Sequence, residues 1–167
     1  MAFMLAALDG QGGSAALSGE RALEVATETD DRIIAALSLM ELGVVRLTQH
    51  RPGEALELFQ RAATLQRAFG NRGREAIALN SIGIAHRRLR RPQEATAFHR
   101  QAILIHRENG DSWRLANALD DLGSALAESG DRDQAEQQWA EALTVLTGLS
   151  DTAATELATE IRQKMAE

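Results

Sequence analysis

The apolar positions of this chain repeat with a period of forty residues over residues 31–150. Leucine or isoleucine, glycine and alanine return at the same places in each block, without any shift in register. The recurring small residues are Gly43, Gly83 and Gly123, then Ala55, Ala95 and Ala135, then Ala62, Ala102 and Ala142. A fixed period of this length is typical of helical repeat proteins, in which each repeat packs on its neighbours.

Each block contains two segments whose apolar residues are spaced as on one face of an α-helix. A short turn separates the two segments, so the sequence predicts one helical hairpin in each of the blocks 31–70, 71–110 and 111–150. The residues expected at the helix boundaries are Pro52 and Pro92 at starts, Asp31, Asn71, Asp111 and Asp131 as N-terminal caps, and Gly70 and Gly110 at ends.

The glycines at positions 43, 83 and 123 fall in the middle of predicted helices. Glycine there costs about 1 kcal/mol relative to alanine, so each needs a compensating role. Close packing of two helices supplies one, because a residue without a side chain lets the partner helix approach. We therefore expect these positions to belong to the core of each hairpin.

The start of the chain departs from the repeat. Residues 14–28 have the register of a second helix, and only Phe3–Leu8 remain of the first, so residues 1–30 are expected to be a partial repeat. Residues 10–14, Gly-Gln-Gly-Gly-Ser, are expected to form the turn between them, with Ser14 as the cap. They lack the Gly-Lys-Ser/Thr ending of a phosphate-binding loop. An apolar repeat end left open predicts a longer protein or end-to-end stacking with a partner.

The end of the chain keeps an apolar helical stripe, formed by Ala154, Leu157, Ala158, Ile161 and Met165. It lacks the alanine, leucine and glycine that a further hairpin would need, because Glu156, Thr159 and Gln163 occupy those positions. Residues 151–167 are therefore predicted to form a capping helix.

The motif Leu42-Gly43-x-x-Arg46, followed by Ala55-x-x-x-Phe59-x-x-Ala62, resembles the signature of the tetratricopeptide repeat. The resemblance covers nearly the whole chain. It implies an all-α fold, a right-handed superhelix of antiparallel helix hairpins (an α-solenoid), and non-catalytic binding of other proteins. The sequence departs from the signature where the family has tyrosine in the first helix, at Arg46, His86 and Leu126, and where the second-helix aromatic is His99.

The forty-residue period is longer than the usual tetratricopeptide repeat. It resembles a long-helix subclass found in scaffold proteins and in the sensor arms of large bacterial transcriptional regulators. Two functions therefore follow from the resemblance. The first is a protein- or peptide-binding scaffold, and the alternative is a sensor and oligomerisation region of a larger regulator.

The resemblance also implies that the first helix of each hairpin lines a concave binding surface. Helical spacing gives the candidate peptide-binding residues as Leu37, Met40, Val44 and Leu47, then Ile77, Asn80, Ile84, Arg87 and Arg88, then Asn117, Asp120 and Ser124. This row changes from apolar to basic to polar, so we expect a partner segment with apolar side chains and a carboxylate against Arg87. A second interpretation stays open, in which an upstream part of the protein covers the apolar row.

Charge is distributed unevenly along the chain. The net charge of −6 divides into −4 for residues 1–30, +1 for 31–70, +5 for 71–110, −6 for 111–150 and −2 for 151–167. The basic block 71–110 favours acidic partner segments. The overall acidity and the absence of tyrosine argue against nucleic acid as a ligand of this domain. The open apolar start, or the acidic block meeting the basic block of another copy, also offers a route to self-association.

The remaining features favour no catalytic or metal site. The chain has no cysteine, and no apolar run approaches the roughly 18 residues of a membrane span. We therefore expect a cytoplasmic protein without a cofactor. His99 and His106 lack the further ligands that zinc needs. His86 and His99 hold positions whose aromatic rings meet in related hairpins, so we expect them to touch as part of the core.

Overall fold

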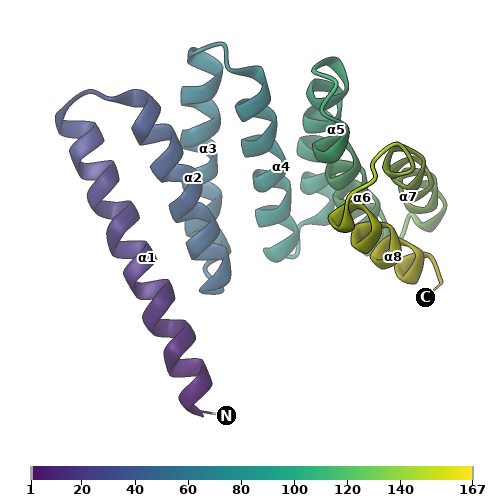
Figure 1. The fold of residues 1–167 in the computed structure, drawn as a ribbon, viewed down its shortest axis with the longest axis horizontal. Helices are drawn as coiled ribbons and strands as arrows, with labels where there is room; N and C mark the ends of the chain where they lie inside the picture. Colours follow the sequence, from purple (N-terminus) through teal and green to yellow (C-terminus); the bar gives the residue numbers. More distant parts are fainter. Residues whose placement is uncertain (1, 167) are drawn as a thin grey trace. The chain divides into compact units, whose positions relative to one another are not determined.

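The computed structural model describes the backbone of residues 2–166, with the side chains of residues 13, 14 and 16–166. The helices in this part of the chain are α1 (Ala2–Glu28), α2 (Arg32–Thr48), α3 (Pro52–Ala68), α4 (Arg72–Arg88), α5 (Pro92–Glu108), α6 (Ser112–Glu128), α7 (Arg132–Leu146) and α8 (Thr152–Ala166). These eight helices are the only regular elements among the described residues (Figure 1). The predicted all-α class is confirmed.

The chain forms two compact units that divide after Ala78, within α4. The first unit contains α1, α2, α3 and the beginning of α4. The second unit contains the rest of α4 together with α5 to α8. Each unit has its own hairpin of packed antiparallel helices, α2 with α3 in the first and α6 with α7 in the second.

The helix ends recur every twenty residues. A residue with positive φ follows each of the first six helices, and the next N–H bonds to a carbonyl five residues back, as in a Schellman motif. These residues are Asp30, His50, Gly70, Arg90, Gly110 and Gly130. The predicted stops at Gly70 and Gly110 are thus confirmed, and the same backbone turn also occurs where no glycine is present.

The helix starts also follow the sequence prediction. Pro52 and Pro92 occupy the first turn of α3 and α5. The side chain of Asp31 accepts from the N–H groups of Ile33 and Ile34. Asn71, Asp111 and Asp131 accept in the same way from the N–H group three residues ahead of each. These contacts satisfy backbone donors that a helix leaves free at its start.

Each mid-helix glycine packs directly against a ring of the facing helix. A Cβ atom added at Gly43 would lie 2.3 Å from the ring of Phe59, and one added at Gly83 or Gly123 would lie 2.5 Å from the ring of His99 or Trp139. All three rings are almost fully buried. The predicted close approach is confirmed, and its immediate partner is the aromatic ring at position 59, 99 or 139.

The predicted turn at residues 10–14 is wrong. Helix α1 continues from Ala2 to Glu28, so it is one long helix instead of a remnant of a first helix joined to a second. Glycine weakens a helix by about 1 kcal/mol but still adopts helical φ and ψ, whereas proline removes a hydrogen bond. The glycine cluster was therefore an insufficient stop signal. The side chains of Phe3–Leu8 lie outside the described residues.

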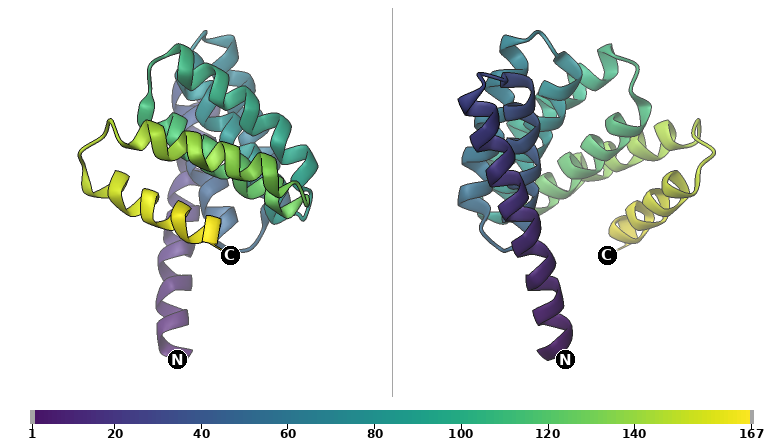
Figure 2. Two further views of the ribbon diagram at one scale, coloured as in Figure 1. Left: turned by 90° about the vertical axis from the view of Figure 1, so that its right-hand side faces the viewer. Right: turned by 60° about the vertical axis from the view of Figure 1, so that its left-hand side comes forward.

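Helix α8, the predicted capping helix, belongs to the second unit. Its stripe of Ala154, Leu157, Ala158 and Ile161 is buried, and it packs against α7 and α6 (Figure 2). Met165, the fifth residue of the predicted stripe, is only partly buried. Arg132 of α7 donates to the carbonyl oxygens of Lys164 and Met165, at 2.9 and 3.1 Å. These bonds satisfy carbonyls at the C-terminal end of α8 that have no partner within the helix.

Candidate functional site

The apolar part of the predicted binding row lies on α2 in the first unit. Val44 is 52% exposed. Leu37, Met40 and Leu47 are partly buried, so each still presents some surface to solvent. Ile77, at the start of α4, is also partly buried. The α2 row therefore remains accessible to a ligand within this unit.

The corresponding residues of α4 are engaged by α6 in the second unit. Asn80 donates from Nδ2 to Oδ2 of Asp121 at 2.8 Å. Arg87 pairs with Oδ1 of Asp121 at 3.4 Å and with Oε1 of Glu128 at 2.7 Å. The amide and the guanidinium, seven residues apart on α4, thus hold one carboxylate of α6 between them. Arg87 already has two carboxylate partners inside the molecule.

The same amide also fixes the proton of His99. Oδ1 of Asn80 lies 2.7 Å from Nδ1 of His99, and because that oxygen only accepts, Nδ1 must carry the proton. Nε2 of His99 is buried without a hydrogen-bond partner. Burial, followed by the positive charge of Arg87 and the neighbouring His86, lowers the pKa of His99 from 6.5 to about 3. His99 is therefore neutral near pH 7.

Asp121 has the opposite shift. Burial raises its pKa from 3.8 to about 6, although the hydrogen bond from Asn80 and the charge of Arg87 favour its ionised form. The result is a chain of contacts, His99 to Asn80 to Asp121 to Arg87 to Glu128, that connects α5, α4 and α6. We call these five residues the polar network. Its role in the molecule is to join neighbouring helices.

The third part of the predicted row is covered by the capping helix. Nζ of Lys164 lies 2.6 and 2.8 Å from the carboxylate oxygens of Asp120, and 3.5 Å from the hydroxyl of Ser124. Asn117 is partly buried and donates to the carbonyl of Trp113. Asp120 and Ser124 thus contact α8 in this structure.

Two further residues of the predicted row, Ile84 and Arg88, lie in the second unit. Ile84 is partly buried and Arg88 is exposed. Arg88, unlike Arg87, has no hydrogen-bond or ion-pair partner among the described residues. It is therefore the cation of this row that a carboxylate ligand can reach.

The positions that depart from the repeat signature are used for packing and ion pairs. The ring stacked on His86 is that of Phe98, with centroids 5.3 Å apart and an interplanar angle of 13°. His86 also affects His99 electrostatically, but the expected ring contact is made with the preceding residue of α5. Arg46 joins three helices, since it pairs with Glu20 of α1 at 2.5 Å and with Glu54 of α3 at 3.2 Å.

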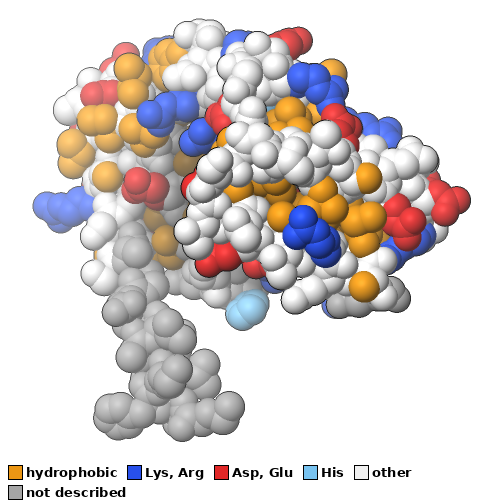
Figure 3. Space-filling model, turned by 45° about the vertical axis from the view of Figure 1, so that its right-hand side comes forward, with side chains coloured by type: hydrophobic (Ala, Val, Ile, Leu, Met, Phe, Trp, Pro, Cys, Tyr) orange, Lys and Arg blue, Asp and Glu red, His pale blue; other side chains and the backbone are white. Residues whose placement is uncertain are grey.

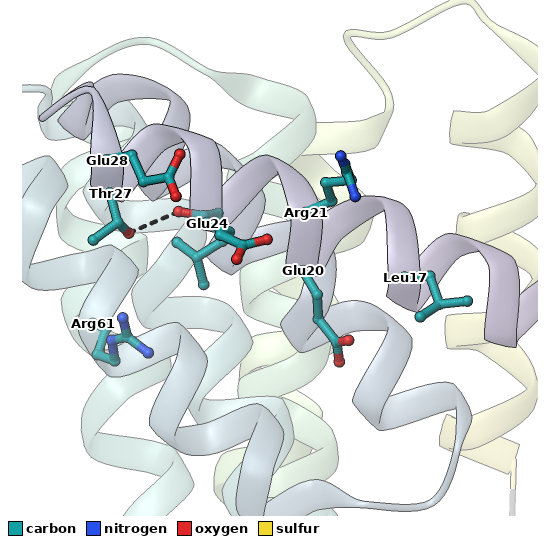
Figure 4. Close-up of a pocket in the computed structure, with 8 residues that line it drawn as sticks. Leu17, Glu20, Arg21, Glu24, Thr27, Glu28 and Arg61 are labelled. Carbon is teal, nitrogen blue, oxygen red and sulfur yellow. Dashed lines mark hydrogen bonds between the residues drawn. The ribbon is translucent and has the colours of Figure 1, made fainter.

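Helix α1 borders three hollows in the first unit. One, of about 750 Å³, is lined by Leu17, Glu20, Arg21, Leu23, Glu24, Thr27, Glu28 and Arg61. Figure 4 shows three glutamates spaced along α1 and Arg61 projecting from α3 on the other side. A second hollow, of about 520 Å³, lies between Ser18 and Gly19 of α1 and Glu41, Val44 and Val45 of α2. These are shallow surface features and not enclosed active-site cavities.

The described residues form no candidate metal cluster. Figure 3 shows acidic and basic side chains interspersed over the face that it displays. No group of three or more His, Asp or Glu side chains among the described residues is placed to hold a metal ion. None of the helices in the same part of the chain is long and apolar enough to cross a membrane.

Sequence reasoning missed the pairing of Asn80 and Arg87 with Asp121. The signal was present in the register, because Asp121 follows Arg87 by 34 residues and Asn80 by 41, close to one period. Residues one period apart lie on first helices of neighbouring hairpins. A residue predicted to contact a ligand on this face should therefore first be checked for a partner about one period later in the sequence.

Comparison with known proteins supports the same architecture. Residues 70–147 match a family model of the tetratricopeptide repeat. No curated protein sequence matches the chain. The match includes the whole of α4, α5 and α6, which carry the polar network, and α7.

Several solved structures share the fold at low sequence identity. BtubC (BKLC) from P. vanneervenii has a TM-score of 0.77 at 20% identity, covering 84% of this chain and 58% of that one. A putative kinesin light chain of Podospora anserina with nearly identical TPR-like repeats has a TM-score of 0.74 at 15% identity, with coverages of 93% and 80%. The TPR domain of Arabidopsis FLU has a TM-score of 0.64 at 19% identity, with coverages of 68% and 95%. Residues 70–147 are therefore similar to the tetratricopeptide repeat, and the chain has the all-α fold of tetratricopeptide solenoids.

Proposed function

We propose that this chain is a non-catalytic scaffold that binds a segment of another protein through the first-helix faces of its hairpins. Tetratricopeptide repeats generally mediate protein–protein interaction, which supports this class of function. The observation that carries the proposal is the accessible apolar row on α2. Leu37, Met40, Val44 and Leu47 form this row, and Val44 keeps 52% of its surface exposed.

The chemistry of the partner follows from which side chains are still available. Apolar side chains of the partner would pack on the α2 row, since burial of apolar area is the main driving force for such docking. In the second unit the available cation is Arg88, because Arg87 is held by Asp121 and Glu128. An acidic residue of a partner is therefore proposed to meet Arg88.

The test compares wild type with a Leu37→Asn, Met40→Asn double variant in a pull-down from source-cell extract. Asn117 and Asn80 occupy the equivalent positions of the other hairpins, so the fold already accepts asparagine there. We expect a partner that is captured by the wild type and lost by the variant. Each buried apolar side chain contributes about 1.5–3 kcal/mol, so two together account for far more than tenfold in affinity.

Ile33→Asn serves as the matched control. Ile33 is 63% exposed on the same helix but lies outside the row. This variant should capture the same partner as the wild type. Capture of identical proteins by the wild type and the double variant would remove the α2 row as a binding surface.

A further inference from the structure

Among the described residues, nothing covers one side of α2, although the equivalent side of α6 is covered. Ser18, Gly19, Glu41, Val44 and Val45 line the hollow of about 520 Å³ beside α1. We call these five residues the open face. Glu41 is exposed and has no ion pair in the described part of the chain. Val45 is only partly buried, and Val44 is the most exposed apolar residue of the hollow at 52%.

The repeat register shows what covers the same face of α6. Asp121 stands two periods after Glu41, and Ala125 stands two periods after Val45. Asp121 receives Asn80 and Arg87 from α4, and Ala125 is 0% exposed. In the second unit a helix therefore lies over this face and brings an amide and a guanidinium to the carboxylate.

Glu41 provides the same chemical group at the same register as Asp121, without the covering helix. A helix placed on α2 as α4 is placed on α6 would bring its side chains at two positions seven residues apart to Glu41. Its apolar residues would lie over Val45, whose equivalent Ala125 is buried in the second unit. The site thus fits an amphipathic helix with a basic or amide residue facing Glu41.

A second copy of the chain is a poor occupant. The outer side of α8 presents Glu156, Thr159 and Gln163, which are all exposed and polar, so it offers no apolar face. Two open faces packed on each other would bring Glu41 of one copy close to Glu41 of the other. Like charges in contact oppose association. The complementary partner is therefore basic.

We propose that the open face is the docking site of a basic amphipathic helix from another protein, seated on α2 as α4 is seated on α6. The inference goes beyond the proposed function, because it concerns the side of α2 turned toward α1 and shares only Val44 with the α2 row. It would stand even if that row bound nothing.

The probe is a peptide that copies residues 72–91 of the chain, which include Asn80 and Arg87. Its six arginines and one glutamate give a net charge of +5. A side-chain staple on the face away from Asn80 and Arg87 holds it helical, since isolated helices of this length are marginal in water. Binding to the full chain is measured by isothermal titration calorimetry. We expect Glu41→Arg to weaken it by about tenfold or more.

Charge exchange gives the sharper test. A peptide with Arg87→Glu should bind the wild type weakly. It should bind the Glu41→Arg chain with most of the affinity that the unchanged peptide has for the wild type. Glu57→Arg makes the same charge change at an exposed position of α3 and should leave binding unchanged. The Leu37→Asn, Met40→Asn variant should also bind the peptide normally, which separates this site from the α2 row.

Three results would overturn the proposal. They are no binding of the stapled peptide to the wild type at concentrations up to about 1 mM, equal binding to the Glu41→Arg chain, and no recovery in the charge exchange. Equal binding to the Glu41→Arg chain would instead indicate that the peptide replaces α4 on α6.

Discussion

At the residue scale, the rings that pack on the three mid-helix glycines differ in polarity. Phe59 and Trp139 meet the demands of a buried position directly, since Trp139 also donates from Nε1 to the carbonyl of Asp120 at 3.3 Å. His99 carries two nitrogens into the same space and finds a partner for only one. An unpaired buried polar atom costs about 1–3 kcal/mol. The middle hairpin is therefore the one whose core responds to protonation.

Replacing His99 by phenylalanine should remove a pH-dependent loss of stability. Below pH 6.5 the unfolded chain binds a proton at His99, whereas the folded chain does not until pH about 3, so acid favours unfolding. Wild type should lose about 1.4 kcal/mol per pH unit relative to His99→Phe below pH 6. Urea denaturation between pH 7 and 5 measures the difference, and a constant difference over this range would contradict the assignment.

Protonation of Asp121 has the opposite effect on stability to protonation of His99. The pKa of Asp121 is raised from 3.8 to about 6, so the folded chain binds a proton that the unfolded chain does not, and this term favours folding as the pH falls from 6 toward 3.8. The term is shared by wild type and His99→Phe. It therefore reduces the acid sensitivity of both without cancelling their difference.

Arg90 is a second residue whose local structure lowers the stability of the folded chain. Its φ of 60° lies in the left-handed region, where glycine stands at 110 and 130 and where a long side chain is disfavoured. Arg90→Gly should raise the free energy of unfolding by about 0.5–1 kcal/mol, since the gain in the folded state exceeds the added chain entropy of the unfolded state.

The matched control is Gly110→Ala, which should lower stability by a similar amount because alanine there meets the same restriction. Thermal unfolding of both variants checks the sign. A destabilising effect of Arg90→Gly would show that the arginine side chain contributes a contact worth more than the strain.

At the element scale, helix boundaries were largely predictable because local chemistry determines them. Capping aspartates, proline in the first turn and glycine after the last turn act within four residues, so one sequence suffices to identify them. The predicted turn at residues 10–14 was wrong because it rested only on the low helix propensity of glycine. Contacts between helices, such as Asn80 with Asp121, could not be read locally, because they depend on which faces of α4 and α6 come together.

Arg132 of α7 is one of the residues that hold α8 in place. Arg132 donates to two carbonyls at the end of α8 and lies 5.2 Å from the centre of the Trp139 ring. Arg132→Ala should therefore speed amide hydrogen exchange in α8 by about tenfold, the effect of losing a charged hydrogen bond. Arg114→Ala, which removes an exposed ion pair with Asp111, is the control and should leave α8 unchanged.

At the scale of the whole molecule, the repeat predicted the all-α class and the sequence of helices, but it overestimated the candidate site. Helical spacing selected one face of each first helix as the candidate surface, and this choice stays a prediction. Spacing could not show that Asp120 and Ser124 meet Lys164, a residue of the capping helix with no equivalent in the other blocks. The apolar row on α2 and the exposed Arg88 are what remains accessible of the predicted surface, and they carry the proposed function.

Because Trp139 packs on Gly123 in the core of its hairpin, its fluorescence can report on the state of that hairpin. With no tyrosine and only two tryptophans, nearly all near-ultraviolet absorption and emission come from Trp113 and Trp139. Trp139 is 2% exposed in the hairpin of α6 and α7, whereas Trp113 is 36% exposed at the start of α6. Opening of that hairpin admits solvent to the buried indole, so a red shift of its fluorescence follows the third repeat while leaving the Phe59 and His99 hairpins spectroscopically silent.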